Sequence, residues 1–286
     1  MALYIGLLLG ISAMLGFGIY DFYLAMLARR IGTLNSVFWF QLGTVMLYLS
    51  LYVSISFVFH SAYRLSLLDI IMIIGAALLG ILPLIAYVKG LRSGSVSVVS
   101  ATASGWGAVT AILAILILKE SLSYLKILLI ALIVAGTVAV SYSRSGKKLQ
   151  STGALYGIAA LLGWGVFFFI AAIIVSRVGW LAFTVLQSIP STAFAYAFCK
   201  AGRSKVFMKK KDILLLAAVC VIGTAAFIVY NIGVGYGNYV SIVAPISAAS
   251  PMITITMAYL LLGERMELSQ KIGIVAILAG IILLAI

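Results

Sequence analysis

Ten apolar runs, each close to the ~20 residues that a helix needs to cross a membrane, dominate the sequence. They cover roughly 3–28, 34–59, 67–91, 95–118, 122–143, 152–176, 180–199, 213–236, 239–262 and 266–286. In lipid only helices and closed barrels satisfy the backbone polar groups, and continuous rather than alternating apolar runs favour helices. We therefore predict an all-α polytopic membrane protein with ten transmembrane helices.

The composition excludes a soluble domain and argues against nucleic acid as a partner. Hydrophobic residues make up 65% of the chain and charged residues 9%, too few to cover a water-exposed fold. The formal charge of +13 comes from short basic clusters between apolar runs, such as Arg29–Arg30 and the stretch 200–211. This distribution is typical of loops that face anionic headgroups. We expect a multi-pass integral protein of the cell (plasma) membrane, surrounded by the lipid bilayer, with no nucleic-acid partner.

One stretch of the sequence occurs twice, which divides the chain into two related halves. Residues 116–136 read LILKESLSYLKILLIALIVAG, and residues 260–280 read LLLGERMELSQKIGIVAILAG. An ungapped alignment places Glu120 on Glu264 and Gly136 on Gly280. We predict two five-helix repeats, 1–146 and 147–286. We interpret Glu120 and Glu264 as complementing the dipoles of the helices that follow them.

The odd number of helices in each half determines how the halves are inserted. The second repeat must enter the membrane from the side opposite to the first, so the two are inverted about an axis in the membrane plane. Secondary transporters use this architecture and bind substrate near the midplane, between the repeats. The duplication therefore favours a transporter.

Glycines recur at matching positions in the first helix of each half. Residues 15–18 read LGFG and residues 162–165 read LGWG, and each helix also has a GxxxG pair, at 6/10 and 153/157. A GxxxG pair lets two helices approach closely. Two explanations stay open for the glycines of LGFG and LGWG: close packing, or bending of the helix near the bilayer centre.

With these motifs the sequence resembles the drug/metabolite transporter superfamily, in particular its ten-helix members built from two EamA-like halves. The resemblance rests on LGFG and LGWG, on Lys119–Glu120 and Gly263–Glu264, and on the fourth and ninth predicted helices, which contain SATASGWGAVTAILAILIL and APISAASPMITITMAYLLL. It implies a carrier, not an enzyme, for amino acids, nucleotide-linked sugars, sugar phosphates or other metabolites. It also implies that predicted helices 1, 3, 4, 6, 8 and 9 surround a central cavity, supported from outside by helices 5 and 10.

Two indications disagree about the orientation in the membrane. Most of the 19 Lys and Arg residues lie in the odd-numbered connections, and a positive-inside distribution would put both termini outside the cell. The resemblance implies that both termini lie inside. The orientation therefore stays open.

Asp21 is the first candidate for a functional residue. It lies inside the first predicted helix, where a carboxylate costs ~2.5–3.5 kcal/mol on insertion scales. Such a group persists in a membrane only with a partner or a water-filled cavity, so Asp21 is a candidate for binding substrate or a coupling proton. The alternative is a structural role, in which Asp21 pairs with a basic residue such as Arg29.

Lys89, Tyr230 and Asn231 are further candidates for substrate contacts. Lys89 ends the third predicted helix, where it either extends to the headgroups or meets Asp21 or an anionic substrate. Tyr230 and Asn231 lie where the resemblance implies cavity-facing aromatic and polar residues. Packing between helices is the alternative for this pair.

Trp106, Trp164, Gln41 and Gln187 lie well inside their predicted helices. Tryptophan usually settles at the membrane interfaces, and a central one has an indole N–H to satisfy, which favours a polar cavity. The two glutamines either line that cavity or join helices by hydrogen bonds.

The sequence contains no nucleophile–base pair, zinc pattern, phosphate-binding loop or dinucleotide fingerprint. We predict no catalytic residues, no cofactor and no metal site. We expect a secondary transporter, monomeric or homodimeric, that moves a small polar or amphipathic metabolite by alternating access. Amino acids come first because the candidate residues combine aromatic and amide groups. The alternatives are a membrane-embedded enzyme, a lipid-handling protein or a channel.

Overall fold

The computed structural model describes residues 2–56, 65–93, 96–120, 122–141, 150–204, 206–236, 240–262 and 267–285. Its helices are α1 (Ala2–Ile31), α2 (Thr33–Ser56), α3 (Leu67–Ser93), α4 (Val96–Ser104), α5 (Trp106–Ile117), α6 (Tyr124–Ser141), α7 (Gln150–Val178), α8 (Trp180–Ala201), α9 (Ile213–Gly235), α10 (Val240–Ala248), α11 (Pro251–Leu262) and α12 (Leu268–Ala285), with the 3₁₀ turn η1 (Lys210–Asp212) before α9. The predicted boundary between residues 146 and 147, Gly263 and Glu264 lie outside the described residues.

The all-α membrane fold is confirmed for the described ranges, which contain helices and no strand. Seven described segments are long and apolar enough to cross a membrane, and three shorter apolar helices join them at 102–117, 124–139 and 268–284. Together they correspond to the ten predicted segments. The chain is a multi-pass integral membrane protein.

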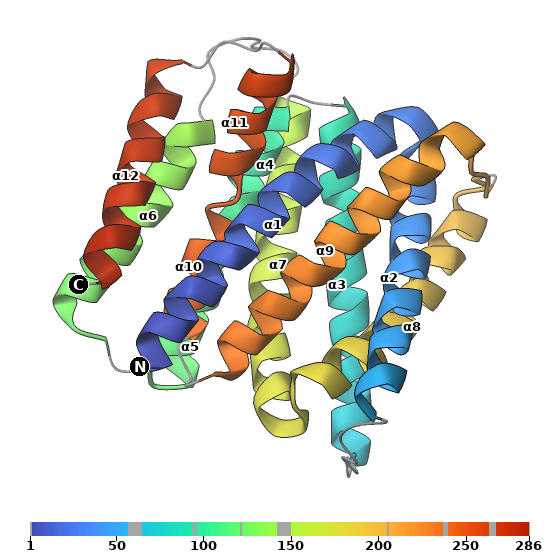
Figure 1. Cartoon of the computed structure of the whole chain (residues 1–286), viewed down its shortest axis with the longest axis horizontal. Coiled ribbons are helices and arrows are strands. Elements are labelled where there is room, and N and C mark those ends of the chain that lie inside the picture. The colour runs from blue at the N-terminus through green and yellow to red at the C-terminus, as the bar shows by residue number, and fades with distance from the viewer. Residues whose placement is uncertain are drawn as a thin grey trace.

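The fourth and ninth predicted helices each consist of two pieces, α4–α5 and α10–α11 (Figure 1). At both interruptions the last turn tightens: the Gly105 amide donates to the Thr102 carbonyl, and the Ser250 amide to the Ser247 carbonyl, each at 3.3 Å. Pro251 opens α11, where its missing N–H would be without a helical partner anyway. The two halves thus contain matching breaks in their fourth helices.

The helices pair across the two halves in a symmetric pattern. α1 lies along α9 and α3 lies along α7, while α2 pairs with α8 and α6 with α12. In Figure 1, α1 rises from the lower left and α7 descends toward the bottom, so the first helices of the two halves run in opposite directions. This is the arrangement that two inverted repeats produce.

The glycines of LGFG and LGWG are explained by close packing. A Cβ added at any of them would approach a residue on another helix within 2.4–2.7 Å, closer than real Cβ atoms come. The pairs are Gly16 with Ala226, Gly18 with Ile253, Gly163 with Pro83, and Gly165 with Val109. The motif therefore lets α1 approach α9 and α11, and lets α7 approach α3 and α5 in the matching way.

Hydrogen bonds repeat the same symmetry. Thr254 donates its hydroxyl to the Gly18 carbonyl and Thr110 to the Gly165 carbonyl, both at 3.0 Å. At the turns that end α1 and α7, Gly32 and Gly179 have φ of 90° and 84°, a region that favours glycine. The duplicated sequence thus specifies duplicated contacts.

Glu120 stabilises a different helix from the one we predicted. α6 begins only at Tyr124, and the Glu120 carboxylate instead accepts hydrogen bonds from the backbone amides of Val240 at 3.2 Å and Ser241 at 3.1 Å, and from the Ser241 hydroxyl. These amides belong to the first turn of α10, whose N–H groups have no partner within the helix. A carboxylate from the first half therefore caps a helix of the second half.

Candidate functional site

A central cavity lies between the two halves, in the part of the chain that the structure describes. It contains about 890 Å³ of empty space, counting the part that opens outward, against about 220 Å³ for a second cavity near Ser104 and Pro245. Its lining residues are Phe17, Tyr20, Asp21, Phe40, Gln41, Thr44, Tyr48, Gly80, Leu84, Trp106, Trp164, Phe167, Phe168, Phe183, Thr184, Gln187, Ser188, Phe227, Asn231 and Ser250.

Both halves contribute to this cavity, but their last helices do not. No described residue of α6 or α12 lines it, as expected for helices that support the cavity from outside. α2 and α8 each contribute four lining residues, among them our candidates Gln41 and Gln187, although the resemblance did not place these two helices around the cavity. A signal was present: Gln41 and Thr44 on α2, and Thr184, Gln187 and Ser188 on α8, recur every three or four residues, which places them on one face of each helix.

Six of the eight predicted site residues line the cavity: Asp21, Gln41, Trp106, Trp164, Gln187 and Asn231. Lys89 does not, because it lies at the exposed end of α3 with its ammonium 5.1 Å from the centre of the Tyr156 ring. Tyr230 does not line it either. Its side chain is fully buried behind Trp106 and Phe168, at ring-centre distances of 5.8 and 4.8 Å.

Asp21 is partly exposed to the cavity and lies beside a tyrosine that sequence reasoning missed. The hydroxyl of Tyr87, a buried residue of α3, is close enough to interact with its carboxylate. The Tyr87 ring in turn packs against Trp164, with ring centres 4.9 Å apart. Within the described residues Asp21 forms no ion pair, so neither Arg29 nor Lys89 neutralises it here.

An aromatic wall, defined here as Phe17, Trp106, Phe168 and Phe227, forms one side of the cavity. Phe168 stacks on Trp106 with ring centres 4.1 Å apart and lies nearly parallel to Phe227 at 6.1 Å, while Phe17 meets Phe227 edge-on at 5.0 Å. The four rings come from α1, α5, α7 and α9. Helices from both repeats thus meet at this wall.

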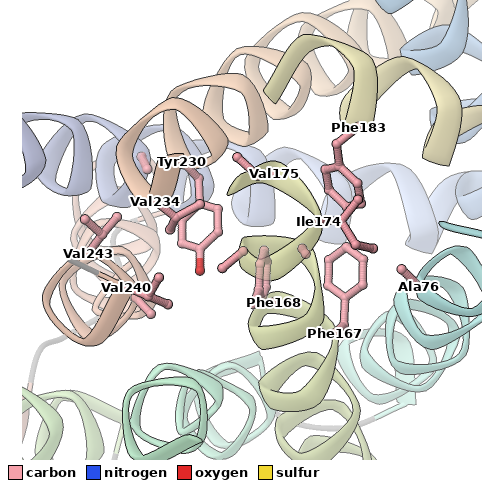
Figure 2. Packing of buried hydrophobic residues seen from close by; sticks show 14 of the residues in the cluster. Ala76, Phe167, Phe168, Ile174, Val175, Phe183, Tyr230, Val234, Val240 and Val243 are labelled. Carbon is pink, nitrogen blue, oxygen red and sulfur yellow. The ribbon is translucent and has the colours of Figure 1, made fainter. Parts of the chain in front are cut away.

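Figure 2 shows how Tyr230 supports that wall from behind. Its ring lies beside Phe168, and its hydroxyl points into the space bounded by Phe168 and Val240. Phe168 is the repeat counterpart of Asp21. The two halves therefore place different groups at matching positions, a carboxylate in one and a phenyl ring in the other.

Amide and hydroxyl groups supply the polar part of the lining. The Gln187 amide donates to the Ser191 hydroxyl at 2.8 Å within α8, and Thr192 donates to the Gln41 backbone carbonyl at 3.1 Å, which joins α8 to α2. The hydroxyl of Tyr20 is buried and has no hydrogen-bond partner among the described residues. Tyr20 therefore lines the cavity with other atoms, while its hydroxyl lies in the protein interior.

Asp21 is the one charged side chain among the described lining residues, which include no Lys, Arg or His. Two described arginines form ion pairs at the ends of helices: Arg30 with Asp212 at 2.9 Å and Arg177 with Asp69 at 3.3 Å. No group of His, Cys, Asp and Glu side chains that could hold a metal ion occurs in the described ranges.

Comparison with known proteins matches the chain to a single family model twice. The model of the EamA-like transporter family matches residues 4–142 and again residues 151–286. A solved crystal structure, titled only as that of a protein, has the same fold, with a TM-score of 0.72 and 16% sequence identity over 94% of each chain. The search of curated proteins found no match.

Proposed function

Because the chain belongs to the EamA-like transporter family, we propose that it is a secondary transporter that moves a small amphipathic metabolite by alternating access. Amino acids are the first candidates for the cargo, since aromatic rings, amides and one carboxylate meet in the cavity. The observation that carries this proposal is the central cavity itself, which lies between two inverted repeats and is lined by both. Substrate sites of inverted-repeat carriers occupy that position.

Alternating access is favoured by the way the halves meet. The contacts of α1 with α9 and α11 are matched by those of α7 with α3 and α5, so the two halves offer two equivalent arrangements around one cavity. Rocking one half against the other exchanges these arrangements. The cavity then faces each side of the membrane in turn.

Counterflow in reconstituted vesicles tests this proposal. Purified protein is first screened by thermal shift against amino acids, amines, nucleosides and sugar phosphates, because a bound ligand raises the melting temperature. Vesicles preloaded with the best unlabelled ligand should then accumulate the labelled ligand transiently and saturably. Unitary currents instead of saturable counterflow would identify a channel and overturn the carrier.

Asp21→Asn tests the role of the carboxylate in the same assay. We expect flux to fall by about tenfold or more, since replacing a buried, hydrogen-bonded charge typically costs 2–5 kcal/mol of binding. Ser54→Ala, an exposed change on α2, is the control and should leave flux unchanged. Unchanged flux in a folded Asp21→Asn protein would remove Asp21 from the mechanism.

A further inference from the structure

The charge of the lining limits which cargo the cavity can hold. Its described lining contains one carboxylate, on Asp21, three side-chain amides, on Gln41, Gln187 and Asn231, and no basic group. From this we infer that the cavity selects a positively charged amine: its ammonium pairs with Asp21 and its apolar body packs on the aromatic wall. The inference rests on the proposed function and narrows the cargo of that site from amino acids to amines that lack a carboxylate.

Electrostatics explains the preference for a cation. An anion would place a second negative charge beside Asp21 in a cavity with a mostly apolar lining, where like charges repel more strongly than in bulk water. A zwitterion would satisfy Asp21 with its ammonium but would leave its carboxylate with amide and hydroxyl partners only. A buried charge without an opposite partner is costly, so the amine without a carboxylate binds best.

The aromatic wall reinforces this selection. The faces of Trp106, Phe168 and Phe227 carry negative electrostatic potential and attract a cation within about 6 Å of a ring centre. The same rings also remove an apolar body from water. An amine that carries an aromatic or aliphatic group therefore binds through its charge and through its apolar body.

Tyr87 acts as a positioning residue for the carboxylate. Its hydroxyl interacts with the Asp21 carboxylate, and its ring packs against Trp164, so we infer that Tyr87 orients the carboxylate toward the cavity. An ammonium has several donors, and the oxygens of the Asp21 carboxylate and of the lining amides of Gln41, Gln187 and Asn231 are acceptors for them.

Three probes with one shared ring test the inference: phenethylamine, phenylalanine and 3-phenylpropanoate. They present a cation, a zwitterion and an anion on the same aromatic body. Binding to the purified protein is measured by titration calorimetry and thermal shift at fixed pH. We expect the dissociation constant of phenethylamine to be about tenfold lower than that of phenylalanine. Phenylpropanoate should bind weakest.

Variants connect that ranking to named side chains. Asp21→Asn should reduce the preference of the amine over the anion to about threefold or less, and Asp21→Glu should restore it. Tyr87→Phe should weaken amine binding and leave anion binding unchanged, which a merely structural role would not do. Equal affinities of the three probes for the original protein would overturn the inference. So would an unchanged ranking in a folded Asp21→Asn protein.

The outcomes separate this inference from the proposed function. If the ranking holds but no probe shows counterflow, the site selects cations and the carrier proposal fails. If counterflow occurs but phenylalanine or phenylpropanoate binds as tightly as phenethylamine, the carrier stands and the selection by charge is wrong.

Discussion

Gly163 and Gly75 lie in neighbouring helices but have different surroundings. A Cβ on Gly163 of α7 would lie 2.4 Å from the Pro83 ring of α3, whereas a Cβ on Gly75 of α3 would meet nothing within 4 Å. Proline is rigid and cannot move aside. The same chemical change should therefore have opposite effects at the two positions.

Alanine substitution measures that difference. We expect Gly163→Ala to lower the free energy of unfolding by about 1–3 kcal/mol through overpacking. Gly75→Ala should raise it by up to about 1 kcal/mol, because glycine is unfavourable inside a helix. Thermal melting of both variants in detergent checks the prediction. A Gly163→Ala protein as stable as Gly75→Ala would show that α7 does not approach α3 so closely.

Asp21 and Phe168 show that the duplication specifies the scaffold but not the site. They occupy matching positions in α1 and α7, and the glycines just before them make matching contacts. The side chains themselves differ in charge, size and role. The positions around the cavity follow from the repeat, while its chemistry comes from residues that the two halves do not share.

The cap on α10 is a feature of elements rather than of single residues. All nine residues of α10 are buried, so its first N–H groups depend on partners within the protein. The Glu120 carboxylate supplies those partners from the segment between α5 and α6. Glu120 thereby fixes the first turn of α10. At its other end α10 leads into the break at Ser250, which lines the cavity.

Removing this cap should destabilise the protein measurably. Glu120→Ala leaves buried amides without acceptors and should lower the free energy of unfolding by about 2 kcal/mol. Glu120→Gln keeps one acceptor oxygen and should lower it by about half as much. Thermal melting checks both values. If the Glu120→Ala and Ser241→Ala effects add fully in the double variant, the hydrogen bond from the Ser241 hydroxyl to the Glu120 carboxylate does not contribute to stability.

Much of the fold could be predicted from the sequence because lipid restricts the choices. Apolar runs of spanning length leave only helices, and the duplication arranges them in pairs. The break at Gly105 could not be located in this way, because an apolar composition is the same in one helix or two, whereas Pro251 is a sequence signal for the break at Ser250. The partner of Glu120 could not be found either, since it comes from the other half of the chain.

The sequence predicted those site residues whose type is unusual inside an apolar membrane helix. Asp21, Trp106 and Asn231 stand out in apolar helices, and all three line the cavity. Tyr87 does not stand out, because a tyrosine near a helix end is common in membranes. Its role depends on where α3 places its hydroxyl relative to α1, and this is a property of the packing.

At the scale of the whole molecule, two ion pairs join the halves at opposite ends. Arg30, at the end of α1, pairs with Asp212 before α9, and Arg177, at the end of α7, pairs with Asp69 at the start of α3. Figure 1 shows the first pair of helix ends at the upper right and the second at the bottom. In each pair the carboxylate is buried and the guanidinium is about half-exposed.

Both ion pairs are formed in this structure, so α1–α9 and α3–α7 are each held together at one end. Under the proposed alternating access, full opening of the cavity to one side separates the helices that meet at that side. Each opening then breaks one ion pair and keeps the other. An ion pair with one half-exposed partner contributes ~1 kcal/mol, and this amount changes the ratio of two states about fivefold.

Asp212→Asn and Asp69→Asn should therefore bias the transporter in opposite directions. A cysteine placed in the cavity by Ser188→Cys, in a background without the two native cysteines, reports access to a membrane-impermeant maleimide in sealed vesicles of known orientation. We expect each variant to speed labelling about fivefold from the side of its broken ion pair and to slow it from the other. The double variant Arg30→Asp with Asp212→Arg restores the attraction and should return labelling toward the original rates. If both single variants speed labelling from the same side, the ion pairs do not hold opposite ends of one alternating mechanism.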